Sequence, residues 1–393
     1  MDINSQWIYS FFQPYPNHPV TDGMSPFYKP YLLIRMTKPQ VIAFYLPQFY
    51  PTPENDAWWE PGFTEWTNVK RAKPLFKDHE QPRQPGELGY YDLRDATFRQ
   101  RQAEMAREAG IEGFCYWHYW FAGRRLLNTV FDEVVQSGQP DFPFCLCWAN
   151  HSWYKKTWDA SKPDALLMEQ TYPGVQDYID HFNAMLPAFK DSRYMKVDGR
   201  LLFGVYAPLD IPDFTLMKDT WNRLAKANGL AGFYFFGFTF EKERPEIGRI
   251  LARGFEAVVV DRIFTAVTGR SALSKWSMRV YHKLFGRYPL LSYDKYSRTV
   301  LADAYTETVH PCLLPNFDHS PRSGRKGIII TGHSPERWGR LCKQIFQKTC
   351  CRKHNLIFIK AWNEWGEGNY LEPDSVYGNG FLQALKNVLS QSK

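Results

Sequence analysis

Eight short apolar runs recur along the 393-residue chain, and polar or amphipathic sequence separates each run from the next. Runs of this length and composition are typical of strands that are buried on both faces, as in parallel sheets. Strands that alternate with helices predict an α/β fold, either a (β/α)8 TIM-type barrel or a doubly wound open sheet. The number of runs, and the lack of a glycine-rich nucleotide loop after the first, favour the barrel. The runs are Val41–Pro47, Gly113–Trp117, Pro143–Trp148, Arg200–Tyr206, Gly232–Phe238, Ala257–Val260, Cys312–Asn316 and Leu356–Ala361.

Amphipathic stretches between these runs predict the helices of the barrel. They are Ala96–Ala109, Arg124–Ser137, Val175–Phe189, Asp213–Asn228, Arg244–Arg253, Pro335–Thr349 and Tyr377–Ser390. Two segments fall outside the repeat. Residues 1–38 are irregular and rich in proline, so we expect an N-terminal arm followed by a catalytic barrel over 39–393. Residues 262–310 are too long for one connection, and helical patterns around Leu273–Phe285 and Lys295–Val309 predict an inserted helical hairpin.

The charge of the chain is modest overall but uneven. A formal net charge of +7 does not argue for a nucleic-acid partner at this size, and we expect none. Between Arg262 and Arg298 there are eight Lys or Arg and one acid, Asp294, interleaved with aromatic residues. Such a segment suits an anionic membrane surface or an acidic glycan, although the solvated face of an inserted hairpin is the simpler interpretation.

Cysteine usage and targeting signals describe the expected environment. The seven cysteines are best explained as reduced thiols, and their spacing lacks the paired ligands of a zinc site, so we expect neither a metal nor a cofactor. Met1–Val20 lacks the pattern of a signal peptide, and no 18-residue apolar run is present. We therefore expect a cytoplasmic protein, with peripheral contact at the inner membrane as a further option.

Near the C-terminus an apolar run opens directly into a segment rich in Trp, Gly and acids. Leu356–Ile359 is followed by Trp362–Asp374, which contains Glu364 and Glu367. Acids three residues apart among indole rings form a plausible acid/base pair, because apolar walls raise the pKa of one carboxyl while its neighbour stays ionised. Glycoside chemistry uses this division of roles. A solvated turn without catalytic function is the competing interpretation.

The barrel interpretation requires functional residues at the C-terminal ends of the strands. Polar and aromatic residues do gather there, and together they suit a sugar, whose C–H faces pack on aromatic rings. A single His at such a position is more often structural than functional, so the convergence of many residues carries the argument. The candidate substrate-binding residues are Tyr45, Gln48, Glu65, Trp66, Tyr116, His118, Trp148, Asn150, Trp153, Tyr206, Asp318, Trp362, Asn363, Trp365 and Tyr370.

Four segments in the same order resemble the WbsX-type proteins of bacterial surface-polysaccharide clusters. They are Tyr45–Val69, Gly113–Leu127, Phe144–Asn150 and Trp362–Asp374. These proteins are similar to glycoside hydrolase family 99, a (β/α)8 family of endo-acting α-mannosidases. The resemblance, which spans about Val41–Leu389, implies that Glu364 removes the proton of the sugar 2-hydroxyl, whose oxygen then attacks the anomeric carbon. It also implies that Glu367 protonates the leaving oxygen and then activates the acceptor.

The chain departs from the family pattern at two places. His151-Ser152 stands where the resemblance predicts Glu-Asn, so a carboxylate contact to sugar is altered there. In the segment after the seventh strand, Asp318 and Arg322 match the pattern, whereas Phe317, His319 and Ser320 do not. We include Arg322 among the substrate-binding candidates. The sugar itself is not implied by the resemblance.

Two classes of function remain open from the sequence. The first is an enzyme of O-antigen, lipopolysaccharide or capsule biosynthesis that hydrolyses or transfers at glycosidic bonds of an oligosaccharide or polysaccharide. The second is a non-catalytic glycan-binding barrel, which the presence of both Glu364 and Glu367 disfavours. The chain has no Asp-x-Asp pair in a metal-binding loop and no phosphate-cradling glycine loop, so a nucleotide-sugar site is not indicated. A lipid-linked glycan donor would need neither, and it would place the basic insertion at the membrane.

Overall fold

The computed structural model describes residues 37–155, 165–241, 245–268, 272–286 and 290–391. The barrel belongs to one unit, Met36–Lys393. The expected N-terminal arm lies outside the described residues, apart from Thr37 and Lys38. Its boundary with the barrel therefore stays a prediction.

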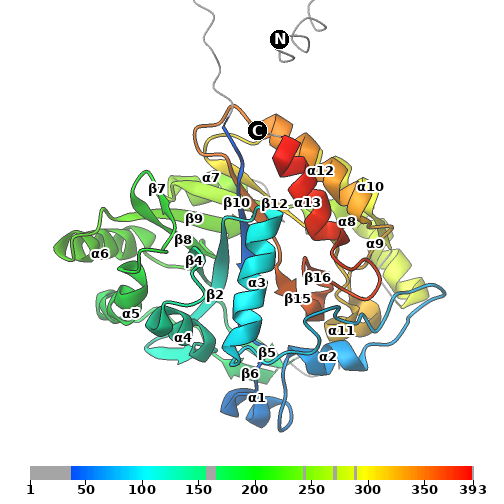
Figure 1. Cartoon of the computed structure of the whole chain (residues 1–393), viewed down its shortest axis with the longest axis horizontal. Helices are drawn as coiled ribbons and strands as arrows, with labels where there is room; N and C mark the ends of the chain where they lie inside the picture. Colours follow the sequence, from blue (N-terminus) through cyan, green and yellow to red (C-terminus); the bar gives the residue numbers. More distant parts are fainter. Residues whose placement is uncertain (1–36, 156–164, 242–244, 269–271, 287–289, 392–393) are drawn as a thin grey trace, which may run out of the picture. The chain divides into compact units, whose positions relative to one another are not determined.

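Eight parallel strands form a closed barrel (Figure 1). Each strand pairs with the next along the chain, and the last pairs with the first, so that Gln40 lies opposite Leu356 and Ile42 lies opposite Gly113. The predicted TIM-type barrel is thereby confirmed. The strands are β1 (Gln40–Tyr45), β2 (Gly113–Phe121), β4 (Phe144–Trp148), β8 (Arg200–Val205), β9 (Phe233–Thr239), β10 (Ala257–Asp261), β12 (Val309–Leu313) and β14 (Leu356–Ile359).

The seventh strand is displaced from its predicted position. It begins at Val309, three residues before the expected start, and ends at Leu313. His310 and Pro311 interrupt the apolar pattern of the sequence, yet His310 is fully buried and contacts Arg352. Because the buried His310 is polar, the apolar pattern did not predict the first half of this strand.

Helices surround the barrel (Figure 1). The segment expected as a helix from Arg124 instead begins with a short strand, β3 (Arg124–Leu126), that pairs antiparallel with the end of β2. The outer helices are α3 (Ala96–Ala109), α4 (Thr129–Ser137), α5 (Val175–Phe189), α6 (Phe214–Ala227), α7 (Glu246–Ala252), α12 (Pro335–Thr349) and α13 (Gly380–Gln391). Short elements lie between the barrel strands and helices. They are α1 (Pro53–Trp58), α2 (Glu65–Arg71), α11 (Ser320–Ser323), the pairs β5 (Trp153–Lys155) with β6 (Ala165–Met168) and β11 (Leu291–Ser292) with β13 (Ile330–Thr331), and β7 (Lys196–Val197), which pairs with the start of β8.

The barrel interior is filled with aromatic rings. Phe44 stacks on Trp117 with ring centroids 4.5 Å apart, and it meets Phe238 edge-on at 5.6 Å. Gly204 on β8 makes room for the neighbouring ring of Phe236, because a Cβ at residue 204 would lie 2.3 Å from that ring. This packed layer closes the barrel beneath the strand ends and gives the rim a rigid base.

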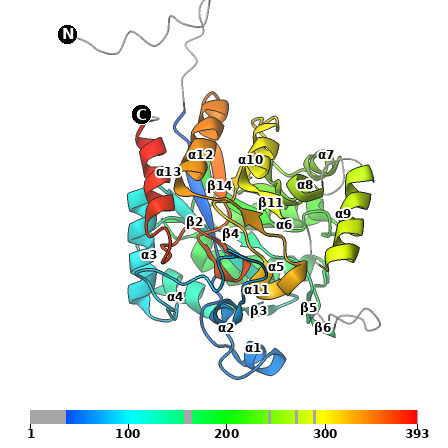
Figure 2. The same ribbon diagram turned by 90° about the vertical axis from the view of Figure 1, so that its right-hand side faces the viewer.

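In the described part of the late insertion there are three helices, α8 (Ile263–Thr268), α9 (Ala272–Phe285) and α10 (Tyr293–Leu301). The last of these ends at Leu301, eight residues before the expected Val309, because Val309 already belongs to the next barrel strand. Helix α10 packs against α8 and α12, whereas α9 stands at the edge of the molecule (Figure 2). The insertion therefore consists of a packed part and an outlying helix.

Candidate active site

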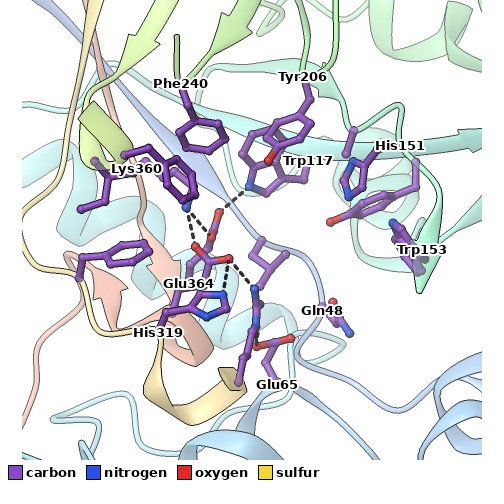
Figure 3. Close-up of a pocket in the computed structure, with 18 residues that line it drawn as sticks. Gln48, Glu65, Trp117, His151, Trp153, Tyr206, Phe240, His319, Lys360 and Glu364 are labelled. Atoms are coloured by element: carbon purple, nitrogen blue, oxygen red, sulfur yellow. Dashed lines mark hydrogen bonds and ion pairs between the residues drawn. The ribbon is translucent and has the colours of Figure 1, made fainter. Parts of the chain in front are cut away.

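The C-terminal ends of the barrel strands open into a pocket of about 380 Å³ (Figure 3). Its wall combines aromatic rings with ionisable groups, as glycan sites do. The lining residues are Leu46, Gln48, Glu65, Trp117, Tyr119, Ala149, His151, Trp153, Tyr206, Phe240, Ile263, Phe264, Phe317, His319, Arg322, Lys360, Glu364 and Glu367.

Two glycines explain how the chain turns the Glu364–Glu367 segment into the pocket. After β14 a short hairpin forms between β15 (Asn363–Glu364) and β16 (Asn369–Tyr370), with one turn of 3-10 helix at Trp365–Glu367. A Cβ on Gly366 would lie 2.1 Å from a carboxylate oxygen of Glu65, so any side chain there would displace that acid. Gly368 has φ of +50° and lies against Asp318, a conformation and a spacing that favour glycine.

Glu367 lies between two cations. Arg322 Nη1 donates to its Oε1 at 2.6 Å, and Lys360 Nζ donates to its Oε2 at 2.6 Å. Burial alone would raise the pKa of Glu367, but the charges of Lys360 and then Arg322 outweigh burial and hold that pKa far below its usual range. Glu367 is therefore an anion throughout the neutral pH range.

Glu364 occupies a different electrostatic environment only one helical turn away. Trp117 Nε1 donates to its Oε1 at 2.7 Å, and Lys360 Nζ lies 3.2 Å from its Oε2 (Figure 3). Burial and the negative charge of Glu367 raise the pKa of Glu364 to about 7, although Lys360 opposes the shift. One acid of the pair is thus ionised and the other gains and loses a proton near neutrality, which is the division that acid/base catalysis requires.

Arg322 connects this pair to a third acid. Its Nη2 lies 2.9 Å from Oε2 of Glu65, the first residue of α2, which follows the first barrel strand in the sequence. The N-cap of that helix is Thr64, whose side chain accepts from the backbone of Trp66 and fixes the start of the helix. The pocket therefore joins the first and last βα units of the barrel through one guanidinium.

Seven of the predicted site residues line the pocket and eleven do not. Those in the wall are Gln48, Glu65, Trp153, Tyr206, Arg322, Glu364 and Glu367. The predicted residues outside the wall are Tyr45, Trp66, Tyr116, His118, Trp148, Asn150, Asp318, Trp362, Asn363, Trp365 and Tyr370. The structure thus places these eleven outside the wall of this pocket, and their contact with a substrate stays a prediction.

Strand alternation explains why Tyr116 and His118 lie outside the wall. Side chains on a strand point alternately to its two faces, so Trp117 and Tyr119 of β2 face the pocket while Tyr116 and His118 face the outer helices. His118 Nε2 lies 2.7 Å from Nε2 of His181 on α5, and burial lowers its pKa to about 3. His118 is thus a neutral structural group.

Tyr45, Trp148 and Asn150 likewise hold the frame. The hydroxyl of Tyr45 donates to Gln102 on α3 at 2.7 Å, and the indole of Trp148 donates to the backbone carbonyl of Trp120 at 3.1 Å. Asn150 bonds the backbone of Ala207 in both directions, which joins the loops after β4 and β8. Proximity to a strand end in the sequence therefore predicts that a residue lies near the rim, but it does not predict whether its side chain faces the pocket.

A buried polar layer lies beneath the Glu364–Glu367 segment. Asn363 bonds the backbone of Leu46 in both directions, which ties the ends of the last and first strands together. Glu372 accepts from Trp365, Tyr91 and Gln102, and burial raises its pKa to about 7.

The remaining aromatic candidates pack around this layer. The ring of Trp365 stacks on Tyr370 at 3.7 Å, and the fully buried Trp362 packs on Phe114 at 5.2 Å. The indole of Trp66 donates to the backbone of Tyr91. These residues support the acids from below.

Asp318 also supports the site from behind. Its carboxylate accepts from His79 and Gln81, and these bonds outweigh burial and lower its pKa well below the usual range. Its backbone N–H donates to the carbonyl of Glu367 at 2.8 Å. Asp318 therefore fixes the backbone of Glu367, although Asp318 itself does not line the pocket.

Sequence reasoning missed several residues of the wall. Trp117 and Tyr119 follow from alternation once the neighbouring positions are assigned to the outer face, and Lys360 immediately follows the last strand. His151 and His319 had been noted only as departures from a family pattern. Phe240, Ile263 and Phe264 lie on loops and a short helix after β9 and β10, where apolar sequence alone carries no signal for a pocket.

Among the described residues, no group of three or more His, Cys, Asp or Glu has the arrangement of a metal site. The acids of the pocket are instead paired with Lys360 and Arg322. These ion pairs set the charges of the acids in the pocket.

Comparison with known proteins places the chain in a family. Two proteins named "Uncharacterized protein WxcX", from two strains of Xanthomonas campestris pv. campestris, are each 35% identical to it, over 371 and 365 residues. The alignments cover 90% of this chain and 50% of each relative, so the chain spans about half the length of the curated relatives it matches.

Solved structures share the fold. One described as a "Glycoside hydrolase-like protein" superposes with a TM-score of 0.57 at 15% identity, covering 96% of this chain and 97% of the other. A glycoside hydrolase family 99 endo-alpha-mannosidase from Bacteroides thetaiotaomicron superposes with a TM-score of 0.50 at 15% identity, covering 90% and 97%. The model of the family "Glycosyltransferase WbsX" matches residues 41–385, nearly the whole barrel. The chain therefore belongs to the glycosyltransferase WbsX family.

Proposed function

We propose that this chain acts at glycosidic bonds of a bacterial surface polysaccharide and uses Glu364 and Glu367 as its catalytic pair. The observation that carries the proposal is the unequal charge of these two acids in one pocket, with Glu367 ionised and Glu364 titrating near neutrality. Family membership supports a carbohydrate substrate. The aromatic wall, which includes Tyr206 and Trp153, suits the apolar face of a sugar ring.

The spacing of the acids favours retention of anomeric configuration. One ammonium, that of Lys360, contacts both carboxylates, so the pair is close together. Retaining glycosidases hold their carboxyl groups about 5–5.5 Å apart, whereas inverting ones leave about 6.5–9.5 Å for a water. The intermediate of a retaining reaction can be resolved in two ways, since either water or the hydroxyl of a second sugar can accept the glycosyl group. Hydrolysis and transfer are thus two outcomes of the same site.

One assay separates the possible functions. The protein is incubated with the polysaccharide of its host strain, with and without an added oligosaccharide acceptor, and the products are analysed by mass spectrometry. Shortened chains indicate hydrolysis, and acceptor of increased mass indicates transfer. A glycan that binds without turnover under both conditions contradicts the proposal and identifies the barrel as a binding module.

We also propose that the glycan is presented at a membrane surface and that α9 makes the contact. Within the described residues no helix is both long and apolar enough to span a bilayer, so the proposed contact is a surface one. On α9 the apolar residues Leu273, Trp276 and Leu284 are 73%, 61% and 71% exposed, at a spacing that places them on one stripe. The basic Arg279 and Lys283 lie beside that stripe.

This combination is typical of a helix that lies in the interface of an anionic membrane, with apolar side chains inserted and basic ones at the headgroups. The preceding helix α8 packs against α9 and contributes Ile263 and Phe264 to the pocket wall. A membrane-bound α9 would therefore bring a lipid-linked glycan close to the catalytic pair.

A further inference from the structure

One side of the pocket is built from apolar side chains that follow three neighbouring barrel strands, β9, β10 and β12. Phe240 follows β9, Ile263 and Phe264 begin α8 after β10, and Phe317 lies in the connection after β12. We call these four side chains the apolar sector. Phe240 and Phe264 meet edge-on with ring centroids 4.9 Å apart, and Ile263 and Phe317 are 1% and 6% exposed. Side chains of Phe and Ile neither donate nor accept a hydrogen bond.

The other side of the pocket carries polar side chains. Gln48 follows β1, Tyr119 lies on β2, and His151 follows β4. Figure 3 shows Gln48 and His151 on the opposite side of the pocket from Phe240. A sugar in this pocket therefore meets hydrogen-bonding groups on one side and hydrocarbon on the other.

The apolar sector borders the catalytic pair. Lys360 Nζ lies 5.7 Å from the ring of Phe317, and the same ammonium contacts Glu364 at 3.2 Å and Glu367 at 2.6 Å. A sugar whose glycosidic bond lies at these two acids is therefore within reach of the sector. Its substituents on that side pack against hydrocarbon.

Ion pairs and a helix cap hold the apolar sector in place. Arg262 is 3% exposed and forms ion pairs with Glu241 and Asp303, which joins the connections after β9, β10 and α10. The carboxylate of Asp261 accepts from the backbone N–H of Ile263 at 2.8 Å and fixes the start of α8. The sector is therefore a built surface, and its side chains cannot be replaced by polar ones through a small loop movement.

We propose that the sugar held at the catalytic pair is a 6-deoxyhexose and that its methyl group packs against the apolar sector. The inference rests on the proposed function and names the substrate class of that site. A hydroxymethyl group at the same place would lose its hydrogen bonds to water and gain none from Phe or Ile side chains. Apolar sites distinguish a methyl group from its hydroxylated counterpart by about 10–100-fold.

The same chemistry argues against an acetamido sugar at this position. An N-acetyl group also ends in a methyl group, but it carries an amide N–H and a carbonyl, and both need partners when they are buried. The side chains of the apolar sector supply neither. The methyl group of a 6-deoxyhexose has no polar atom to satisfy.

The test measures binding of defined disaccharides to the full chain that carries Glu364→Gln, so that bound ligand is not turned over. The probes are matched α-linked pairs that differ only in methyl or hydroxymethyl at C6, in the manno, gluco and galacto series and in D and L forms, together with 2-acetamido analogues. Calorimetry should show that, in the series that binds, the 6-deoxy member binds about 10–100-fold tighter than its hydroxymethyl partner.

Substitutions in the apolar sector test its role directly. Phe264→Tyr and, separately, Phe240→Tyr each add one hydroxyl to the sector, so the preference for the 6-deoxy member should fall by about 5-fold or more. The matched control is Phe285→Tyr, which makes the same chemical change at a side chain that is 57% exposed on α9 and outside the pocket. This control should keep the preference of the parent protein.

Three results would overturn the inference. The first is equal or tighter binding of the hydroxymethyl member in every series that binds, and the second is tightest binding of an acetamido analogue. The third is binding of the host polysaccharide without binding of any 6-deoxy probe. Because binding is measured without turnover, a failure here is distinct from a failure of the proposed function, which would show as absent turnover of the host polysaccharide by the wild type.

Discussion

At the scale of single residues, identical side chains acquire different roles from their neighbours. Glu364, Glu367 and Glu372 lie within nine residues of one another, and all three are largely buried. Two cations hold Glu367 ionised, whereas Glu364 contacts one cation and an indole and has a pKa of about 7. Glu372 is surrounded by neutral donors. The motif predicted that acids would be present at this point of the fold, while their charge states follow from Lys360 and Arg322, which approach from other loops or strand ends.

The raised pKa of Glu372 predicts a pH dependence of stability. A carboxyl with a folded pKa of about 7 and an unfolded pKa near 4.3 binds a proton more strongly when folded, so its effect destabilises the fold as pH rises from about 4.3 to 7. Glu372→Gln removes this term. Urea unfolding at pH 5 and pH 8 should show a smaller loss of unfolding free energy with rising pH in the variant than in the wild type. A pH dependence identical in both proteins would contradict the buried, raised carboxyl.

At the scale of elements, strand ends and the loops after them build the site. The hairpin of β15 and β16 carries the acids, α11 and α2 deliver Arg322 and Glu65, and β2 supplies Trp117. The sequence predicted which strand ends gather at the rim, because parallel strands of a barrel end on one side. The orientation of each side chain could not be predicted, since a register error of one residue exchanges the inner and outer faces, as at Tyr116, Trp117 and His118.

Helix α9 makes an element-scale prediction for membrane binding. The full chain should sediment with vesicles that contain anionic lipid and much less with zwitterionic ones. The double variant Trp276→Ser/Leu284→Ser should reduce binding at any salt concentration, because it removes inserted apolar area. Arg279→Glu/Lys283→Glu should reduce binding most at low salt, because the electrostatic term is screened as salt rises.

Two controls match these variants. Val376 is 60% exposed and Lys353 is a surface lysine, and both lie outside the insertion, so Val376→Ser and Lys353→Glu should bind like the wild type. Equal binding to anionic and zwitterionic vesicles, or no effect of the α9 variants, would contradict the membrane contact. Self-association of the protein that the Trp276 variant abolishes would instead identify a second copy as the occupant of this surface.

At the scale of the whole molecule, the closed barrel turns distant segments into one site. Glu65 and Arg322 are 257 residues apart in the sequence, and they meet because β12 pairs with β14 and β14 pairs with β1. The count of eight apolar runs favoured that closure over a doubly wound open sheet, because eight βα units are the number that a TIM-type barrel requires. The complete lining of the pocket could not be predicted from the sequence, because Phe240 and Phe264 reach it from connections whose sequence resembles ordinary core.

The catalytic pair can be tested most directly by its turnover. The chain is assayed on the host polysaccharide as wild type, Glu364→Gln and Glu367→Gln, with circular dichroism and glycan binding measured in parallel. We expect each variant to fold and to bind glycan, and to lower the rate of glycosidic bond cleavage or transfer by at least ~100-fold, the scale of positioned acid/base catalysis. Wild-type turnover in either folded variant would contradict the account.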